Sequence, residues 1–172
     1  TILADSGDNP TAGGIGNRID VLEYVFKHKI ENILFAGIFN QKIFSELKNR
    51  KNKIIIKDSI SKKKISILID EFYLKNDNAI VRSNNNTIIF TKYRKPFHYL
   101  SDFKELNINL KKYKILVVKS GYLSPELKKL KADNFMILTD GFVTQDFKRI
   151  KNLFREKPIY PFQKNFRYNI AI

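Results

Sequence analysis

Alternating apolar and polar segments along the first third of the chain predict strands and helices in turn. Apolar runs at residues 1–4 and 33–38 have the length and composition of buried strands. Residues 19–28 and 43–47 place apolar side chains at helical spacing. This strand–helix–strand–helix order predicts parallel strands joined by a right-handed crossover.

The middle of the chain changes to shorter segments rich in β-branched residues, which predict an antiparallel section. We expect strands at 53–57, 65–74, 79–82 and 87–93. Asn84, Asn85 and Asn86 tolerate left-handed backbone, so they predict a hairpin turn between the last two of these strands.

The last third returns to strands and helices. Phe103 and Leu106 indicate a short helix, and residues 115–118 and 135–138 read as strands. Ser124 followed by Pro125 is typical of a helix start. We therefore predict a mixed α/β fold in a single domain, 1–172. It has a βαβα opening with parallel strands, a middle antiparallel hairpin section and a closing βα/β unit. Residues 139–141 predict a turn, and the two prolines in 157–161 predict an extended segment.

Two asparagines are predicted to cap the first two helices. Asn17 precedes the first apolar stripe, with Asp20 three residues later in the position of a capping box. Asn40 stands in the corresponding place before the second stripe.

The segment from Asp5 to Gly16 joins the first strand to the first helix and is rich in glycine. A strand, a glycine-rich turn and a helix start form a ready anion-binding arrangement, because the first N–H groups of a helix have no internal partner. Asp5 and Asp8 would repel an anion unless a metal or a cationic group sits between them. Asp5, Asp8 and Asn9 could contact substrate or support a metal across a domain cleft. Equally, they could bond the backbone of a turn.

The glycines of this segment have two interpretations as well. Gly13, Gly14 and Gly16 could allow close packing of the helix on its strand, or could bind an anion or a substrate carboxylate at the helix start. No acidic residue follows at the distance expected for dinucleotide binding, so NAD is not expected.

The amino-acid composition limits the kinds of partner that this chain is expected to bind. The net charge is +15, yet Lys outnumbers Arg 25 to 7 and Ile outnumbers Ala 24 to 6, a bias that suggests an AT-rich genome. Proteins that recognise nucleic acid depend on Arg for bidentate contacts, so we favour a solvated lysine surface over nucleic-acid binding.

The absence of Cys fits a cytoplasmic protein. No apolar run is long enough to span a bilayer, and we expect no membrane partner.

Several segments together resemble one family. The segment from Asp5 to Gly16 is similar to the Asp-x-x-Asp-Asn-Pro-Gly-Gly-Gly-x-x-Gly segment that opens the C-terminal domain of the microcystinase C (MlrC) family of metallopeptidase-like proteins, although Thr11 and Ala12 depart from it. The run from Lys119 to Leu127 resembles that family's Lys-x-Gly-Tyr-Leu-x-Pro-Glu-Leu variant. The segment 96–98 and the tail 155–162 are also similar to the family.

The resemblance implies that two domains of a longer protein have different roles. In that family the catalytic metal, expected to be zinc, is held by Asp, Glu and His residues of an N-terminal domain. His28 and His98 lack the spacing of a zinc site, so we expect neither catalytic nor metal-binding residues here. Lys119 ends a strand, where it could meet a substrate carboxylate or simply be solvated. For His98 a structural role is favoured over an active-site role. Tyr122, Tyr160 and Phe162 read as core or interdomain packing.

The resemblance implies that this chain is the accessory half of a zinc-dependent amide hydrolase and is inactive alone. Its partners would be the preceding domain of the same chain and a small peptide or amide substrate. The alternative is a non-catalytic module that binds a small anion or, in second place, nucleic acid. Because the sequence opens inside a predicted strand, we expect a fragment of a longer protein. Loss of a neighbouring domain would expose an apolar patch and favour a homo-oligomer.

Overall fold

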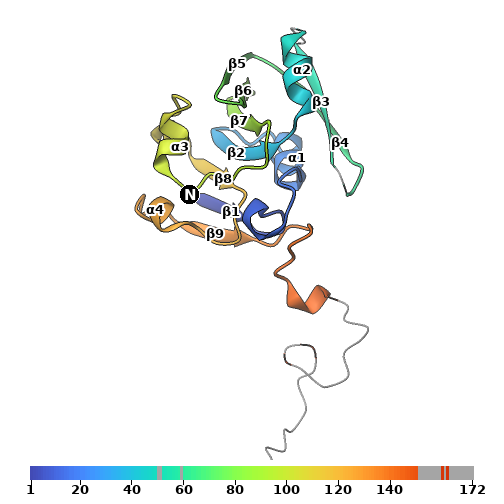
Figure 1. The fold of residues 1–172 in the computed structure, drawn as a ribbon, viewed down its shortest axis with the longest axis vertical. Helices are drawn as coiled ribbons and strands as arrows, with labels where there is room; N and C mark the ends of the chain where they lie inside the picture. The colour runs from blue at the N-terminus through green and yellow to red at the C-terminus, as the bar shows by residue number, and fades with distance from the viewer. Residues whose placement is uncertain (50–51, 59, 151–159, 161, 163–172) are drawn as a thin grey trace, which may run out of the picture.

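The computed structural model describes residues 1–49, 52–58, 60–150, 160 and 162. Figure 1 labels the helices and strands along the chain. In chain order the elements are β1 (Ile2–Asp5), a 3₁₀ turn (Pro10–Ala12), α1 (Asp20–Lys27), β2 (Ile33–Phe39), α2 (Lys42–Lys48), β3 (Lys53–Lys57), β4 (Lys64–Leu68), β5 (Glu71–Lys75), β6 (Asn78–Ser83), β7 (Asn86–Thr91), α3 (Leu100–Lys104), a second 3₁₀ turn (Leu110–Lys112), β8 (Ile115–Val118), α4 (Pro125–Lys128), β9 (Asn134–Ile137) and a third 3₁₀ turn (Phe147–Arg149).

A seven-stranded sheet forms the centre of the described chain, in the order β5-β6-β7-β2-β8-β1-β9. The strands from β7 to β9 in this order pair in parallel, whereas β6 pairs antiparallel with both β5 and β7. Strands β3 and β4 form a separate antiparallel hairpin. The mixed α/β fold predicted from the sequence is confirmed.

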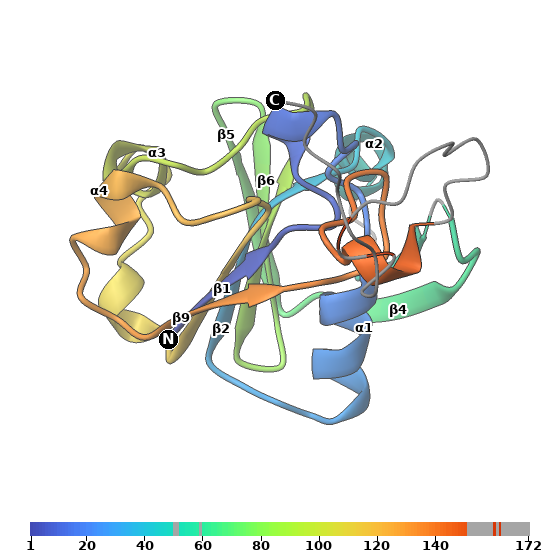
Figure 2. The same ribbon diagram turned by 90° about the horizontal axis from the view of Figure 1, so that it is seen from below.

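Helices cover both faces of the sheet, as Figure 2 shows with α1 on one side and α3 and α4 on the other. Alternate residues of β2 supply the two cores. Phe35 packs in the core that includes α1, α2 and the β3–β4 hairpin. Leu34 and Ala36 pack in the core that includes Phe97 and Phe103. This burial on both faces explains why β2 is a continuous apolar run.

One strand predicted from the sequence forms two separate strands in the structure. The segment 65–74 ends its first strand at Leu68, and the second begins at Glu71 in the other sheet. Between them Ile69 donates its N–H to Asn52, and Asp70 accepts the N–H of Asn84. The chain therefore turns there, which an apolar alternation alone does not reveal.

The predicted turn and one of the three predicted caps are confirmed. Asn84 and Asn85 have φ values of 48° and 57°, as a tight hairpin between β6 and β7 requires. Ser124 caps α4, and its Oγ accepts the N–H of Leu127 at 3.3 Å.

The other two cap predictions are wrong. Helix α1 begins at Asp20 with Ile19 at the N-cap position, so Asn17 lies too early to cap it. Helix α2 begins at Lys42 with Gln41 at its N-cap, so Asn40 is not the cap. Neither N-cap residue makes a side-chain cap hydrogen bond.

The predicted extended segment 157–161 and most of the family-like tail lie outside the described residues. Within the part of the chain that is described, no helix has the length and apolarity needed to cross a membrane.

Candidate functional site

Three adjacent parallel strands, β8, β1 and β9, bring polar side chains together where they end. Asp5 is the last residue of β1, Lys119 directly follows β8, and Thr139 comes soon after β9. The Thr139 hydroxyl donates to the Asp5 carboxylate. The carboxyl edge of an open α/β sheet is the usual place for a ligand.

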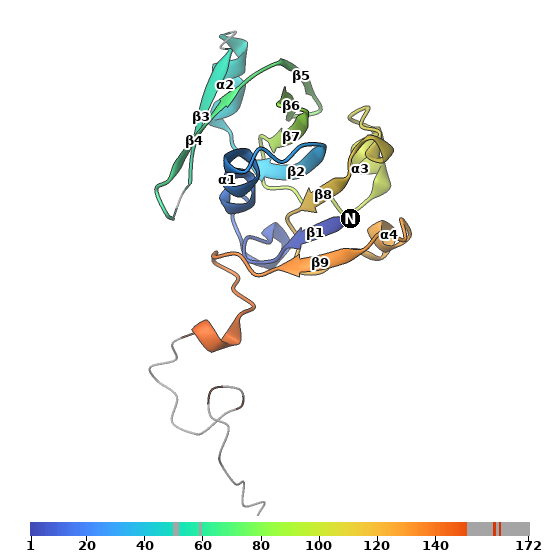
Figure 3. The same ribbon diagram turned by 180° about the vertical axis from the view of Figure 1, so that it is seen from behind.

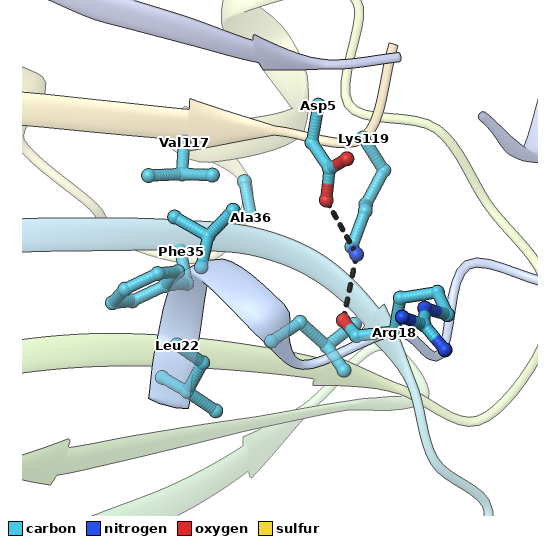
Figure 4. Close-up of a pocket in the computed structure, with 9 residues that line it drawn as sticks. Asp5, Arg18, Leu22, Phe35, Ala36, Val117 and Lys119 are labelled. Atoms are coloured by element: carbon cyan, nitrogen blue, oxygen red, sulfur yellow. Dashed lines mark hydrogen bonds and ion pairs between the residues drawn. The ribbon is translucent and has the colours of Figure 1, made fainter. Parts of the chain in front are cut away.

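Lys119 lies between the two aspartates of the glycine-rich segment. Its Nζ is 2.7 Å from Asp5 Oδ2 and 3.2 Å from Asp8 Oδ2, and it also donates to the carbonyl oxygen of Arg18 at 2.7 Å. Figure 4 shows the ammonium reaching from β8 to Asp5 and Arg18. Lys119 is only 5% exposed and both aspartates are buried. The cationic group that the sequence required between Asp5 and Asp8 is thus the chain's own lysine.

Asp8 holds the segment that precedes α1. Its carboxylate accepts the N–H of Gly16 at 2.8 Å and the N–H of Arg18 at 2.7 Å. These are donors that the sequence suggested for an external anion. An anion binding at this point would have to displace a buried carboxylate, so the internal role of Asp8 is the one the contacts support.

Asn9 and the glycines shape the same turn. Asn9 Oδ1 accepts from the N–H and the hydroxyl of Thr11, at 3.0 and 2.7 Å. A Cβ on Gly14 would lie 2.7 Å from backbone atoms of Asp8 and Asn9, so only glycine fits there. Gly13 and Gly16 have φ values of +99° and +82°, which favour glycine. In these contacts Asn9 forms a turn, and Gly14 packs against the loop itself, not against a strand.

A second buried ion pair, missed from the sequence, adjoins the first. Arg18 lies 2.6 Å from Asp58, and these side chains are 3% and 1% exposed. Arg18 also pairs with Asp20 at 2.6 Å. Asp58 follows β3 and accepts the N–H of Ile19, so it ties the start of α1 to the β3–β4 hairpin. Its partner is 40 residues away, and no local spacing marks such a pair.

The pKa values of Asp20 and Asp58, the two carboxylates around Arg18, are shifted in opposite directions. Burial raises the pKa of Asp20 even though Arg18 opposes that shift. Burial also acts to raise the pKa of Asp58, but hydrogen bonds from Ser61, Ile19 and Ile60 outweigh it. The pKa of Asp58 is therefore held below its ordinary value of 3.8.

Three other residues considered in the sequence are not part of this cluster. The backbone of His98 bonds to Asp102 and Ser124, and its buried Nε2 has no hydrogen-bond partner in the described part of the chain. Tyr122 follows β8 and is 75% exposed, and Tyr160 is 73% exposed. Core packing, one of the two roles expected for these tyrosines, is therefore wrong, and interdomain packing stays a prediction.

The residues described here do not fit the zinc site that the resemblance implies for a longer protein. Among them, no group of three or more His, Asp or Glu side chains is placed to hold a metal ion, and the chain has no Cys. Two pairs of converging carboxylates already hold a cation of the chain: Asp5 and Asp8 hold Lys119, and Asp20 and Asp58 hold Arg18. Zinc ligands within this region would require the Lys119 ion pairs to break.

A family model described as "MlrC C-terminus" matches residues 3–51 and 63–152. The chain belongs to this family. The matched regions include both the segment from Asp5 to Gly16 and Lys119, so the resemblance seen in the sequence is confirmed. No curated protein matches the sequence significantly.

Among solved structures, the MlrC C-terminal fold seen here is similar to a crystal structure described as a "putative metallopeptidase" from Mesorhizobium sp. BNC1. The TM-score is 0.67 at 12% sequence identity. The match covers 97% of this chain and 38% of the Mesorhizobium chain, so this chain spans well under half of that protein's length. At this identity the likeness concerns the fold.

Proposed function

We propose that this chain is the accessory domain of a metal-dependent, peptidase-like amide hydrolase, and that it completes the substrate cleft without supplying metal ligands. The main support for this proposal is the arrangement of side chains at the carboxyl edge of the sheet. There Lys119 pairs with both Asp5 and Asp8, and Asp8 fixes the segment that leads into α1. A rigid, internally satisfied edge suits a wall of a cleft better than a reacting centre.

Family membership and size support the same proposal. The chain belongs to the MlrC C-terminus family and matches 38% of a longer protein described as a "putative metallopeptidase". In this proposal a preceding domain holds zinc, which would polarise the amide and activate water. The residues of this chain would position the substrate and exclude solvent.

Metal content and hydrolysis test the proposal directly. The longest natural protein that contains this chain is compared with the 172-residue chain by elemental analysis and with a panel of small peptide amides. We expect zinc and hydrolysis in the longer protein alone. Zinc bound tightly by the shorter chain, or a longer protein with neither metal nor activity, contradicts the proposal.

Tyr122 tests whether this domain reaches the substrate. It is 75% exposed beside the carboxyl edge, so Tyr122→Ala leaves the core intact. We expect KM of the longer protein to rise about three- to tenfold with little change in kcat, because uniform binding is lost. Tyr24→Ala, at a 59% exposed position on α1, is the matched control and should leave KM unchanged. Equal effects of the two substitutions would contradict a cleft role.

A further inference from the structure

A groove lies next to Asp58, the partner of Arg18. It lies between the end of β2, the start of α2 and the end of β3, and has a volume of about 670 Å³. That volume is in the range of small-molecule sites. Figure 3 shows α2 and the β3–β4 hairpin side by side at this end of the sheet. We name it the α2–β3 groove and define it by Phe39, Asn40, Gln41, Lys42, Ile55 and Lys57.

Chain reversal concentrates positive charge at this end. Helix α2 runs from Lys42 to Lys48, and β3 returns from Lys53 to Lys57. The start of α2 and the end of β3 therefore meet, and Lys42 and Lys57 both line the groove, whereas Lys48 and Lys53 do not. Among the described residues, neither Lys42 nor Lys57 has a carboxylate within ion-pair distance.

The remaining groups of the groove favour an anion. Lys62 adds a third lysine to the lining, while the carboxylates there are Glu46 and Asp58. Three lysines and two carboxylates therefore line the groove, and Asp58 is also bonded by Arg18, which it shares with Asp20. Asn40 and Gln41 also line the groove, and their side-chain amides can donate to an anion.

An apolar wall completes the groove. Ile55 is 60% exposed on the outer side of β3, and Phe39 lies half-buried at the end of β2. Lysines and amides beside such a wall fit a molecule with a charged end and an apolar body. We propose that the α2–β3 groove binds a carboxylate joined to an aliphatic group, the chemistry of a peptide's C-terminal residue. The site concerns binding only, so it stands apart from the hydrolase proposal.

Two small probes test this pairing of charge and apolar surface. We use 4-methylpentanoate and the uncharged 4-methylpentan-1-ol in saturation-transfer NMR titrations of the longest natural protein. Neither molecule contains an amide, so the result does not depend on hydrolysis. We expect the carboxylate to bind at least about tenfold more tightly than the alcohol, since the lysines act only on the charged probe.

Matched double substitutions locate the site. Lys42→Gln with Lys57→Gln should weaken the carboxylate about three- to tenfold, as two exposed ion pairs allow. Lys48→Gln with Lys53→Gln removes the same charge from the same two elements and should change binding less than about twofold. Ile55→Ser, at an exposed position, should weaken both probes through lost apolar contact.

Three results would overturn the inference. They are equal loss in the two double variants, equal binding of the acid and the alcohol, or no binding of the acid. Near-UV circular dichroism checks that each variant keeps the native packing. A protein that binds the acid but hydrolyses nothing would retain this inference while losing the hydrolase proposal.

Discussion

Lys119 Nζ lies 2.7 Å from Asp5 Oδ2 in the protein interior, and these side chains are 5% and 2% exposed. The two residues are 114 positions apart, and the ion pair joins the ends of the neighbouring strands β1 and β8. A buried ion pair is costly to break from one side, because the remaining charge has no water to solvate it.

Lys119→Met should therefore destabilise the fold strongly. It leaves two buried carboxylates, Asp5 and Asp8, without their cation, and we expect a loss of about 3–5 kcal/mol in the free energy of unfolding. Urea denaturation at pH 7 measures the loss. Lys63→Met removes the partner of Glu23 at a position 57% exposed, and should cost less than about 1 kcal/mol. Comparable losses in the two variants would show that the Lys119 cluster is solvated.

Asp58→Asn should change the acid dependence of stability. The folded pKa of Asp58 lies below 3.8, its value in the unfolded chain. A carboxyl shifted in this direction stabilises the fold above the unfolded pKa, and that contribution disappears as pH falls through the folded pKa. The stability difference between wild type and Asp58→Asn should thus be constant near neutrality and shrink below pH 3.8.

Urea denaturation from pH 7 into the acid range measures this difference. Asp133→Asn, at an exposed position, is the control and should show a small difference throughout. A difference between wild type and Asp58→Asn that grows toward acid would contradict the lowered pKa of Asp58.

Gly13 and Gly14 should respond differently to alanine. At Gly13 the added Cβ meets nothing within 4 Å, and only the φ of +99° opposes it, so we expect a cost of about 1 kcal/mol. At Gly14 the Cβ would lie 2.7 Å from backbone atoms of Asp8 and Asn9, and the cost should reach about 2–3 kcal/mol. Thermal unfolding of both variants measures which substitution loses more stability. A larger loss at Gly13 would mean that backbone strain, and not close approach, governs this loop.

Several features that depend on neighbouring residues were predicted correctly from the sequence. The Ser124 cap, the asparagine turn at Asn84 and Asn85, and the strands β3 and β8 need only a few adjacent positions to specify them. The sequence places Lys119 at the end of one predicted strand and Asp5 directly after another. Parallel strands bring such residues to one edge of a sheet. Their direct contact was not predicted.

Contacts between residues far apart in the sequence explain the wrong cap prediction at Asn17 and the missed Arg18–Asp58 pair. The N–H of Ile19 is bonded by Asp58 from another part of the chain, which explains why α1 does without the cap expected at Asn17. The Arg18–Asp58 pair likewise joins residues 40 positions apart. The packing of the β3–β4 hairpin against α1, which sequence periodicity does not give, brings these residues together.

Among the described residues β9 is an edge strand of the sheet, and this edge should drive self-association of the 172-residue chain. Phe135 and Met136 are 60% and 47% exposed on opposite faces of this edge strand. An open edge with large apolar side chains favours pairing with another molecule. Introducing Phe135→Lys and Met136→Lys together should weaken association at least about tenfold in sedimentation velocity, because charges at an edge oppose strand pairing.

A control variant separates the edge from a general charge effect. Tyr24→Lys with Tyr93→Lys adds the same charge at positions that are 59% and 58% exposed, away from β9. It should leave association unchanged. If a preceding domain covers β9 in the longer protein, the β9 substitutions should also lower that protein's unfolding temperature, whereas the tyrosine substitutions should not. An equal response to both pairs would assign association to net charge, and β9 would then be an ordinary solvated edge.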